Sequence, residues 1–205
     1  MIDIPRHASD LSLLPAHSVA TVNWPAFPAR SSASFRIAWD GVRILLRFEV
    51  RDTAAQAIQT ADNGPVWRDR CVEWFLSLDG VHYYNMEWNA AGTMLAQYGV
   101  SRQDRVFIAP ERLATVERTA SLGGAPLALT AGPIDWSLTL LIPIAFFGDD
   151  ARFIAQGSTV RGNFYLCGDD LPERQYLSHY PVASERPDFH RPESFGPIHF
   201  LQGGL

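Results

Sequence analysis

The sequence predicts an all-β protein, an antiparallel β-sandwich with long functional loops and a few short helices. Segments in which apolar and polar residues alternate with a period of two recur along the chain, and they are rich in β-branched and aromatic residues. Turn-forming pairs such as Asp40-Gly41 and Asp79-Gly80 separate these segments. Apolar residues at helical spacing are scarce, so helices are expected to be short.

The predicted strands follow one another along most of the chain. The first covers residues 42–50, where Ile44, Leu46, Phe48 and Val50 share one face. Further strands with the same alternation are predicted at 71–78, 82–89, 134–142 and 159–167. Such segments are typical of strands that bury one face, and together they are enough for two packed sheets.

The segments between the strands contain the predicted helices and two long loops. Short helices are predicted at 54–59, 110–114 and 144–148. The loops at 51–69 and 167–197 exceed the usual upper limit of about 12–15 residues, which indicates function or disorder. Because both loops are rich in aromatic residues and proline, we expect them to be ordered and to form a binding surface.

Length and composition indicate one domain. The chain has 205 residues, of which 47% are hydrophobic and 19% charged, so it contains enough apolar material for a core and too little charge for disorder. A single domain is therefore expected over 1–205. Within it, residues 1–35 are expected to form an N-terminal extension that packs on the sandwich.

Charge and composition exclude several classes of function. The net charge is −5 and no basic cluster occurs, which argues against nucleic-acid binding. No apolar segment is long enough to cross a membrane, and the N-terminus lacks a secretory signal, so a cytoplasmic location is the default expectation. All 17 basic residues are arginine, which excludes Schiff-base and P-loop chemistry based on lysine.

The hairpin around Asp79-Gly80 predicts a polar group on one sheet face. The apolar rows of both strands consist of even-numbered residues. If the two rows share the core, each of these residues must pair with an even-numbered residue of the other strand, and a three-residue connection between the strands gives this register. Glu73 then lies opposite or diagonal to Glu87, with Cys71, Tyr83, Asn85 and Asn89 on the same face. Facing carboxylates need an arginine, a cation or a proton, and Arg102 and Arg105 are candidate partners. A solvated outer face and the floor of a cleft both fit this pattern.

Trp67 is the most informative aromatic residue. It lies in DNGPVWRD, a loop flanked by charge, whereas the other tryptophans fall in or beside strands and are expected in the core. An exposed indole stacks on the apolar face of a sugar ring, while the sugar hydroxyls need fixed polar partners. Glu73, Asn85 and Glu87 would supply such partners. A loop anchor packed against the protein is the alternative interpretation of Trp67.

Metal binding and catalysis have weaker signals. Loop carboxylates make a Ca²⁺ site conceivable, with Asp62, Asp69 and Asp169 as weak metal candidates. Two cysteines, Cys71 and Cys167, are too few for a disulfide scaffold or a four-ligand zinc site. No catalytic residue is assigned, although Glu73 and Glu87 could reach the separation of about 5–5.5 Å found in retaining glycosidases.

Several stretches around these residues resemble the family 9 carbohydrate-binding modules, in particular their stand-alone relatives. The matching stretches are DNGPVWRDRCVEWFLSLDG, YYNMEWNAAGTMLAQYG, GNFYLCGDDLPERQYLS and PDFHRPESFG. The resemblance implies a β-sandwich that binds a mono- or oligosaccharide, in one branch by its reducing end, between two aromatic walls. Structural calcium also occurs in that branch. Such modules usually accompany glycosidases, which implies a glycosidase partner acting in trans.

The resemblance also implies roles for individual residues. Trp67 matches the first aromatic wall, Glu73 matches a polar ligand contact, and Asn85 and Glu87 lie on the strand that supplies further contacts. Relatives carry tryptophan where this chain has His179, for which Tyr176 or Tyr180 could substitute. The predicted ligand-binding residues are therefore Trp67, Glu73, Asn85, Glu87, Tyr98, Arg102, Tyr176 and His179.

The predicted function is non-catalytic carbohydrate binding. Two alternatives remain open. One is an enzyme of carbohydrate catabolism, a hydrolase acting on glycosidic bonds through Glu73 and Glu87. The other is a sandwich that binds a protein partner and no sugar.

Overall fold

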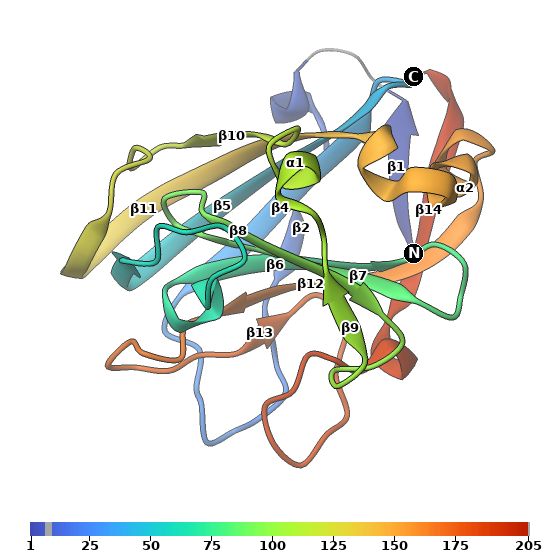
Figure 1. Ribbon diagram of the computed structural model, residues 1–205. Coiled ribbons are helices and arrows are strands. Elements are labelled where there is room, and N and C mark those ends of the chain that lie inside the picture. Colours follow the sequence, from blue (N-terminus) through green and yellow to red (C-terminus); the bar gives the residue numbers. More distant parts are fainter. Residues whose placement is uncertain (7–9, 205) are drawn as a thin grey trace.

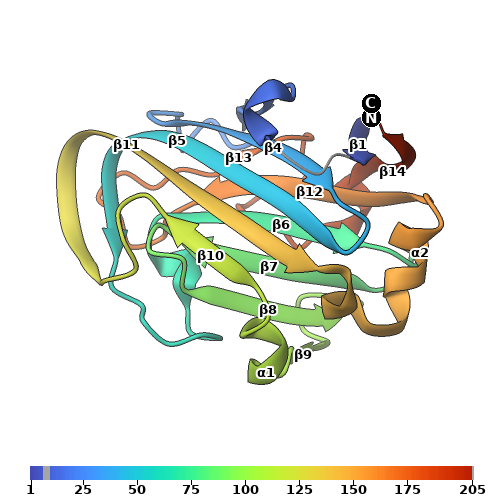
Figure 2. The ribbon, with the colours of Figure 1, turned by 90° about the horizontal axis from the view of Figure 1, so that it is seen from above.

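Two β-sheet layers pack face to face in the computed structural model, which describes residues 1–6 and 10–204 (Figure 1). The strands of one layer cross over those of the other when the molecule is seen from above (Figure 2). The structural comparisons reported below confirm the predicted β-sandwich.

The first layer is antiparallel throughout the strand pairs that define it. Its members in spatial order are β10 (Glu117–Ala120), β11 (Leu127–Pro143), β5 (Arg43–Ala57), β4 (Ser32–Trp39) and β2 (His17–Val19). The long pair β5–β11 continues to Ala57, so the helix predicted at 54–59 is wrong and the predicted loop at 51–69 begins later. The reason is that β11 offers β5 a hydrogen-bonding partner beyond the point where the local apolar pattern weakens.

The second layer carries the polar face. Its members in spatial order are β14 (Gly196–Gly204), β12 (Thr159–Cys167), β6 (Cys71–Ser77), β7 (Tyr83–Asn89), β8 (Met94–Gly99) and β9 (Arg105–Phe107). These neighbours are all antiparallel. A short pair, β3 (Thr21–Val22) and β13 (Leu177–Ser178), extends from β12, so the predicted loop at 167–197 contains a strand.

The N-terminal strand β1 (Ile2–Arg6) connects the two layers. It pairs in parallel with β14 and, at Arg6, with Trp39 of β4. The sheet is therefore mixed rather than wholly antiparallel. The first 35 residues thus contribute strands to the sandwich instead of only packing on it.

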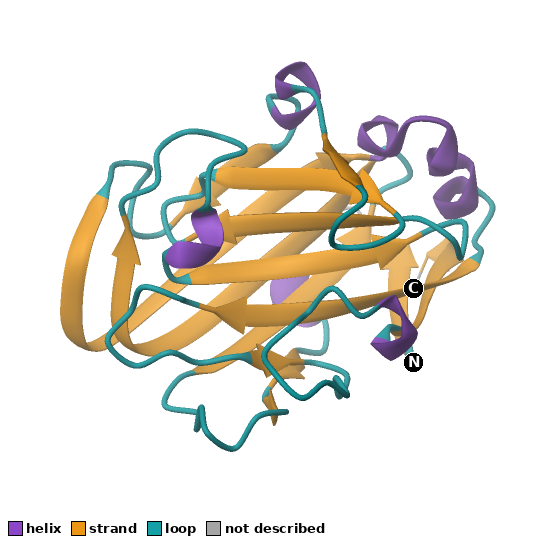
Figure 3. Ribbon diagram, turned by 60° about the horizontal axis from the view of Figure 1, so that its bottom comes forward, coloured by secondary structure: helices purple, strands orange, loops and turns teal. Residues whose placement is uncertain are grey.

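The helices are short and lie around the strands (Figure 3). They are η1 (Leu11–Leu13), η2 (Val66–Arg68), α1 (Pro110–Leu113), η3 (Ile144–Asp150), α2 (Ala151–Ala155) and η4 (Pro192–Ser194). The helices predicted at 110–114 and 144–148 are confirmed. Among the described residues, no helix has both the length and the apolar character needed to span a membrane.

The main core fills the space between the layers. Phe164 of β12 stacks on Phe35 of β4 with ring centroids 3.6 Å apart, and on Trp74 of β6 at 5.5 Å. Apart from His82 and Ile134 at the ends of two segments, the apolar rows predicted on the alternating segments lie in this core, which confirms the period-two interpretation. A second, smaller apolar cluster lies on the opposite side of β6 and β12, under the loops that follow β3 and β13.

The β6–β7 hairpin has the predicted register. Glu73 is directly paired with Glu87, and Phe75 with Asn85. The turn is held by the Asp79 carboxylate, which accepts the N–H groups of Val81 and His82, both at 2.8 Å. Gly80 has φ 78°, a left-handed conformation that favours glycine. The outer face of this hairpin is buried by the long loops, so the interpretation as a solvated face is wrong.

Candidate binding site

The floor of the candidate site is the outer face of β12, β6, β7 and β8. Residues directly paired across antiparallel strands point to the same side of a sheet, so each row of pairs gives one row of side chains. The central row runs Tyr165, Glu73, Glu87, Leu95, and the rows on either side run Cys167, Cys71, Asn89 and Asn163, Phe75, Asn85, Gln97. Acidic, amide and thiol side chains are therefore concentrated on one buried surface.

A pocket of about 230 Å³ opens above this floor. Its walls come from η2, the turn between β8 and β9, and the long segment after β12. The lining residues are Trp67, Glu73, Glu87, Leu95, Gln97, Arg102, Arg105, Cys167, Asp169, Tyr176, Pro187, Asp188, Phe189 and His190. Pockets that enclose drug-sized ligands occupy roughly 300–1,000 Å³, so this one admits a small ligand or one end of a longer ligand.

The wall that carries Trp67 is tied to the segment after β12. The Asp169 N–H donates to the Trp67 carbonyl at 3.2 Å, and the Asp170 N–H donates to the Arg68 carbonyl at 2.9 Å. The Arg68 guanidinium also pairs with the Asp170 carboxylate at 2.7 Å. These bonds hold the backbone of Trp67 while its side chain stays 39% exposed. Trp67 is therefore an aromatic surface at the pocket and not a packed loop anchor.

The opposite set of polar groups is built around Asn85. Its amide N–H₂ donates to Glu87 Oε1 at 2.9 Å, and its Oδ1 accepts from Arg105 Nη1 at 3.0 Å. Arg102 Nη1 lies 3.5 Å from Asp188 Oδ1, which brings the β8–β9 turn against the 187–190 segment. Asn85 thus couples a floor carboxylate to an arginine in the wall.

The two floor glutamates share a buried position. Both are 3% exposed. Burial raises the pKa of Glu73 well above its usual range, and the neighbouring Cys167 and Glu87 add to the effect. Burial also raises the pKa of Glu87 to about 7, against the opposing effects of the Asn85 hydrogen bond and Arg105. Burial therefore favours the protonated form of Glu73, while Glu87 is about half ionised near neutral pH.

His190 is kept neutral beside these groups. Burial, together with the nearby positive charges of Arg105 and Arg102, lowers its pKa to about 2. Its Nδ1 lies 3.1 Å from the Tyr83 hydroxyl. A neutral imidazole offers both a donor and an acceptor nitrogen.

The structure brings together most of the predicted ligand-binding residues. Trp67, Glu73, Glu87, Arg102 and Tyr176 line the pocket. Asn85 is fully buried and lies next to the lining through its bonds to Glu87 and Arg105. The Tyr176 hydroxyl donates to Asp169 Oδ1 at 2.8 Å, so Tyr176 is the candidate for a second aromatic wall.

Tyr98 and His179 lie elsewhere, which corrects their expected position. Tyr98 is paired with Tyr84 on the core side of the second layer. Its hydroxyl donates to the Asp150 carboxylate at 3.3 Å. His179 has an edge contact with Phe35 of the first layer, and its Nδ1 lies 2.8 Å from the Ser18 carbonyl. Strand alternation turns Tyr98 away from the pocket, and His179, which follows β13, packs towards the first layer instead.

Tyr180, the other alternative for the second wall, also lies away from the pocket. It packs against the main core, and its hydroxyl donates to the Pro197 carbonyl at 3.0 Å.

Sequence reasoning missed several lining residues. Gln97 could have been found, because extending the hairpin register to the next strand puts Gln97, and not Tyr98, beside Asn85. Arg105 was considered only as a partner for the carboxylates. Asp188, Phe189 and His190 lie in the loop that was expected to form a binding surface, but a loop without periodicity gives no basis for choosing these residues individually.

The carboxylates proposed for calcium do not gather at one point. Asp62 forms an ion pair with Arg118. Asp69 accepts hydrogen bonds from the Gln59 N–H and the Asn89 amide, and Asp169 accepts one from the Tyr176 hydroxyl. Within residues 1–6 and 10–204, the group of at least three potential metal-ligating side chains is Cys71, Glu73 and Cys167. The fold therefore does not bring these three aspartates together among the described residues.

Comparisons with known proteins point in the same direction as the geometry. The family model described as carbohydrate-binding family 9 matches residues 6–200. A candidate carbohydrate-binding protein from Bacteroides uniformis is 35% identical over 98% of this chain and 97% of that chain, with a TM-score of 0.86. No curated protein matches the chain significantly.

Two more distant structures share the fold. Both are family 9 carbohydrate-binding modules from Caldicellulosiruptor kristjanssonii, one in complex with glucose and one in complex with cellotriose. The glucose complex is 13% identical over 97% of this chain and 94% of that chain, with a TM-score of 0.57. The cellotriose complex is 12% identical over 97% and 92%, again with a TM-score of 0.57.

Proposed function

The chain belongs to carbohydrate-binding family 9, and we propose that its pocket binds a monosaccharide or the terminal unit of an oligosaccharide without catalysing a reaction. The observation that carries this proposal is the exposed indole of Trp67 at the mouth of a small pocket whose floor is polar and buried. The apolar face of a sugar ring stacks on such an indole. Tyr176 would supply the second aromatic wall.

The floor offers hydrogen-bonding groups that suit sugar hydroxyls. Each hydroxyl donates once and accepts twice. Burial favours the protonated form of Glu73, which would act as a donor, while Glu87 Oε2 is buried and lacks a hydrogen-bond partner among the described residues. Arg105 and Gln97 add donors at the side of the pocket. A sugar hydroxyl would satisfy Glu87 Oε2 and reduce the cost of burying it.

The size of the pocket favours one sugar unit. Its volume of about 230 Å³ is small, so the rest of an oligosaccharide would extend into solvent. This arrangement suits a chain end, and the family resemblance points to the reducing end. The modules that bind glucose and cellotriose share this fold. Glucose is a single sugar unit, and cellotriose has a glucose unit at each end.

The related proteins offer no support for the alternative of glycosidic hydrolysis through Glu73 and Glu87. The calcium ion, the glycosidase partner and the cytoplasmic location stay predictions.

Calorimetric titration with glucose, xylose, cellobiose and xylobiose tests the proposed function. We expect saturable heat from at least one sugar, lost in Trp67→Ala and kept in Phe107→Ala, which removes an aromatic ring that is 58% exposed outside the pocket. Repeating the titration with EDTA tests the calcium prediction. No heat from a folded sample at millimolar sugar would contradict sugar binding and favour a protein partner. Hydrolysis products of the disaccharides, detected in the sample after the titration, would favour the enzyme alternative.

A further inference from the structure

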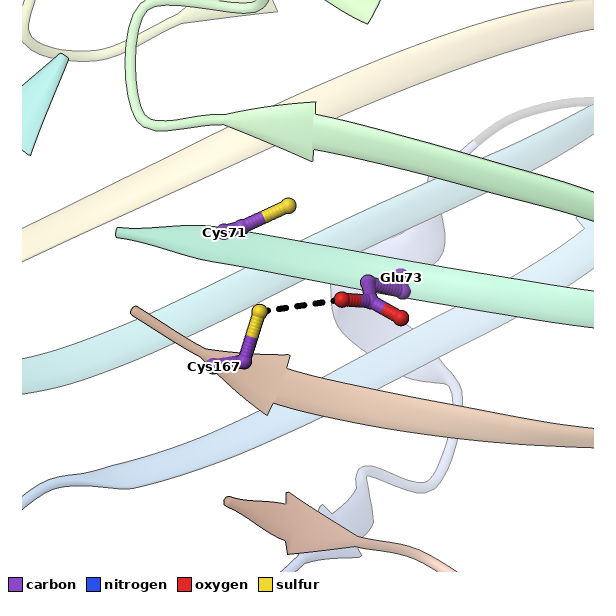
Figure 4. A group of neighbouring side chains, drawn as sticks. All are labelled: Cys71, Glu73 and Cys167. Carbon is purple, nitrogen blue, oxygen red and sulfur yellow. Dashed lines mark hydrogen bonds between the residues drawn. The ribbon is translucent and has the colours of Figure 1, made fainter. Parts of the chain in front are cut away.

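Two thiols and a carboxyl group meet at one end of the floor. Cys71 of β6 and Cys167 of β12 are directly paired across the sheet, although 95 residues separate them in the sequence. Glu73 follows two residues after Cys71 and therefore points to the same side. One ligand atom from each side chain lies within 4.8 Å of the other two (Figure 4).

The spacing suits a small metal ion. In a tetrahedral zinc site the Zn–S bonds are about 2.3 Å and the Zn–O bonds about 2.0–2.2 Å, which places the ligand atoms roughly 3.5–3.8 Å apart. The three ligand atoms here lie within 4.8 Å of one another, so small side-chain rotations would bring them to the tetrahedral spacing. Cys167 Sγ already lies 2.9 Å from Glu73 Oε1.

The cluster can be reached from the pocket. Cys167 and Glu73 line the pocket, while Cys71 is fully buried. An ion held by these three ligands would keep its fourth position directed to the pocket, as in sites that bind a water molecule or a ligand. Thiolate ligands select soft or borderline ions such as Zn²⁺ over Ca²⁺ and Mg²⁺.

The surroundings of the cluster favour a cation. Glu87 faces Glu73 directly, and its Oε2 is buried and lacks a hydrogen-bond partner in the described part of the chain.

The backbone at the cluster is held firmly. Arg70 Nη1 donates to the Cys167 carbonyl at 3.3 Å, and Arg70 Nε lies 2.7 Å from the buried Asp52 carboxylate. This ion pair anchors the neighbours of both cysteines, so the ligand atoms are positioned before an ion arrives.

We propose that Cys71, Cys167 and Glu73 form a binding site for one thiolate-preferring divalent cation, with Zn²⁺ as the representative ion. The cation site shares Glu73 and Cys167 with the pocket proposed for sugar. It does not depend on sugar binding, and its test uses no sugar.

Titration with Co²⁺, a spectroscopic substitute for Zn²⁺, tests this site in the absence of sugar and with a non-thiol reductant present. We expect one equivalent to bind with sulfur-to-cobalt charge-transfer absorption in the near ultraviolet, and Zn²⁺ to abolish that absorption. The chain contains 2 cysteines, so any such band must come from Cys71 and Cys167. A folded protein that shows no charge-transfer band would overturn the proposal.

Variants assign the ligands. Cys71→Ser and Cys167→Ser should each weaken the band and the Co²⁺ affinity at least tenfold, the double variant should lose the band, and Glu73→Gln should lower the affinity about tenfold. Glu193→Gln is the matched control, because this exposed carboxylate lies 3.8 Å from Arg191 and away from the cluster. Unchanged Co²⁺ affinity in the double variant would refute the site.

A second measurement needs no variant, so it tests the site even if the cysteine variants do not fold. In the wild-type protein, Zn²⁺ should slow alkylation of both thiols while Mg²⁺ should not. Equal alkylation rates with the two ions would also refute the proposal.

Discussion

Glu73 and Glu87 face each other across the β6–β7 ladder, and both are 3% exposed on the floor of the pocket. Two ionised carboxylates at directly paired positions would repel each other. Burial favours the protonated form of Glu73, which reduces this repulsion, and Asn85 links Glu87 to Arg105. This pair provides both a donor and an acceptor for a bound hydroxyl, and its protonation makes the stability of the protein depend on pH.

The Glu87→Gln variant should reveal that pH dependence. The pKa of Glu87 is about 7 in the folded protein, whereas an unfolded glutamate has a pKa of about 4.3. The folded state therefore binds more protons in this interval, so the contribution is fully present below about pH 4.3 and is lost as the pH rises through 7. Relative to wild type, Glu87→Gln should gain about 1–3 kcal/mol between pH 5 and pH 8.

Urea unfolding at the two pH values, with a chelator present, measures this difference. Glu193→Gln serves as the control for loss of an exposed carboxylate, and it should show no such trend. A Glu87→Gln difference from wild type that is the same at pH 5 and pH 8 would show that Glu87 ionises normally.

The second aromatic wall can be assigned by substitution. Tyr176→Ala should weaken sugar binding about tenfold, or about 1.4 kcal/mol, because it removes a ring that lines the pocket. Tyr98→Phe and His179→Ala should leave the affinity unchanged, since both side chains lie outside the pocket. Calorimetry on the three folded variants decides the matter, and a loss of affinity in His179→Ala would support the position implied by the family resemblance.

Arg105 should contribute to binding through its charge and its bond to Asn85. Arg105→Ala leaves Asn85 Oδ1 without this donor and removes a positive charge near Glu87. We expect sugar affinity to fall about tenfold, equivalent to about 1.4 kcal/mol. Arg51→Ala, an exposed arginine on β5 in the other layer, is the matched control. Equal affinities for the two variants in calorimetry would remove Arg105 from the site.

The buried Arg70–Asp52 pair should be important for stability. Its two side chains are 1% and 0% exposed, so Arg70→Met leaves an uncompensated charge on Asp52. Such changes cost about 3–5 kcal/mol. Arg68→Ala, which breaks an exposed pair with Asp170, should cost at most about 1 kcal/mol. Similar urea midpoints for the two variants would show that the buried pair is not needed.

The sequence by itself determined five of the strands, β5, β6, β7, β11 and β12, together with most of their core faces and the register of one hairpin. Alternation with a period of two is a local property, so it identified the inward residues of β6 and β7 without knowledge of the remaining fold. A short turn then restricted which residues could pair, and Glu73, Asn85 and Glu87 followed from that restriction. Trp67 was found because a tryptophan between charged residues stands out from the strand pattern.

Only the tertiary structure decided which loops close the pocket and which distant strands meet. Asp188 and His190 reach the site through a loop whose path depends on packing against Phe75 and Tyr165. Cys71 and Cys167 become neighbours because β12 pairs with β6, and not with a strand adjacent in the sequence. Such pairing is set by how the whole core packs between the layers, and no local pattern of residues encodes it.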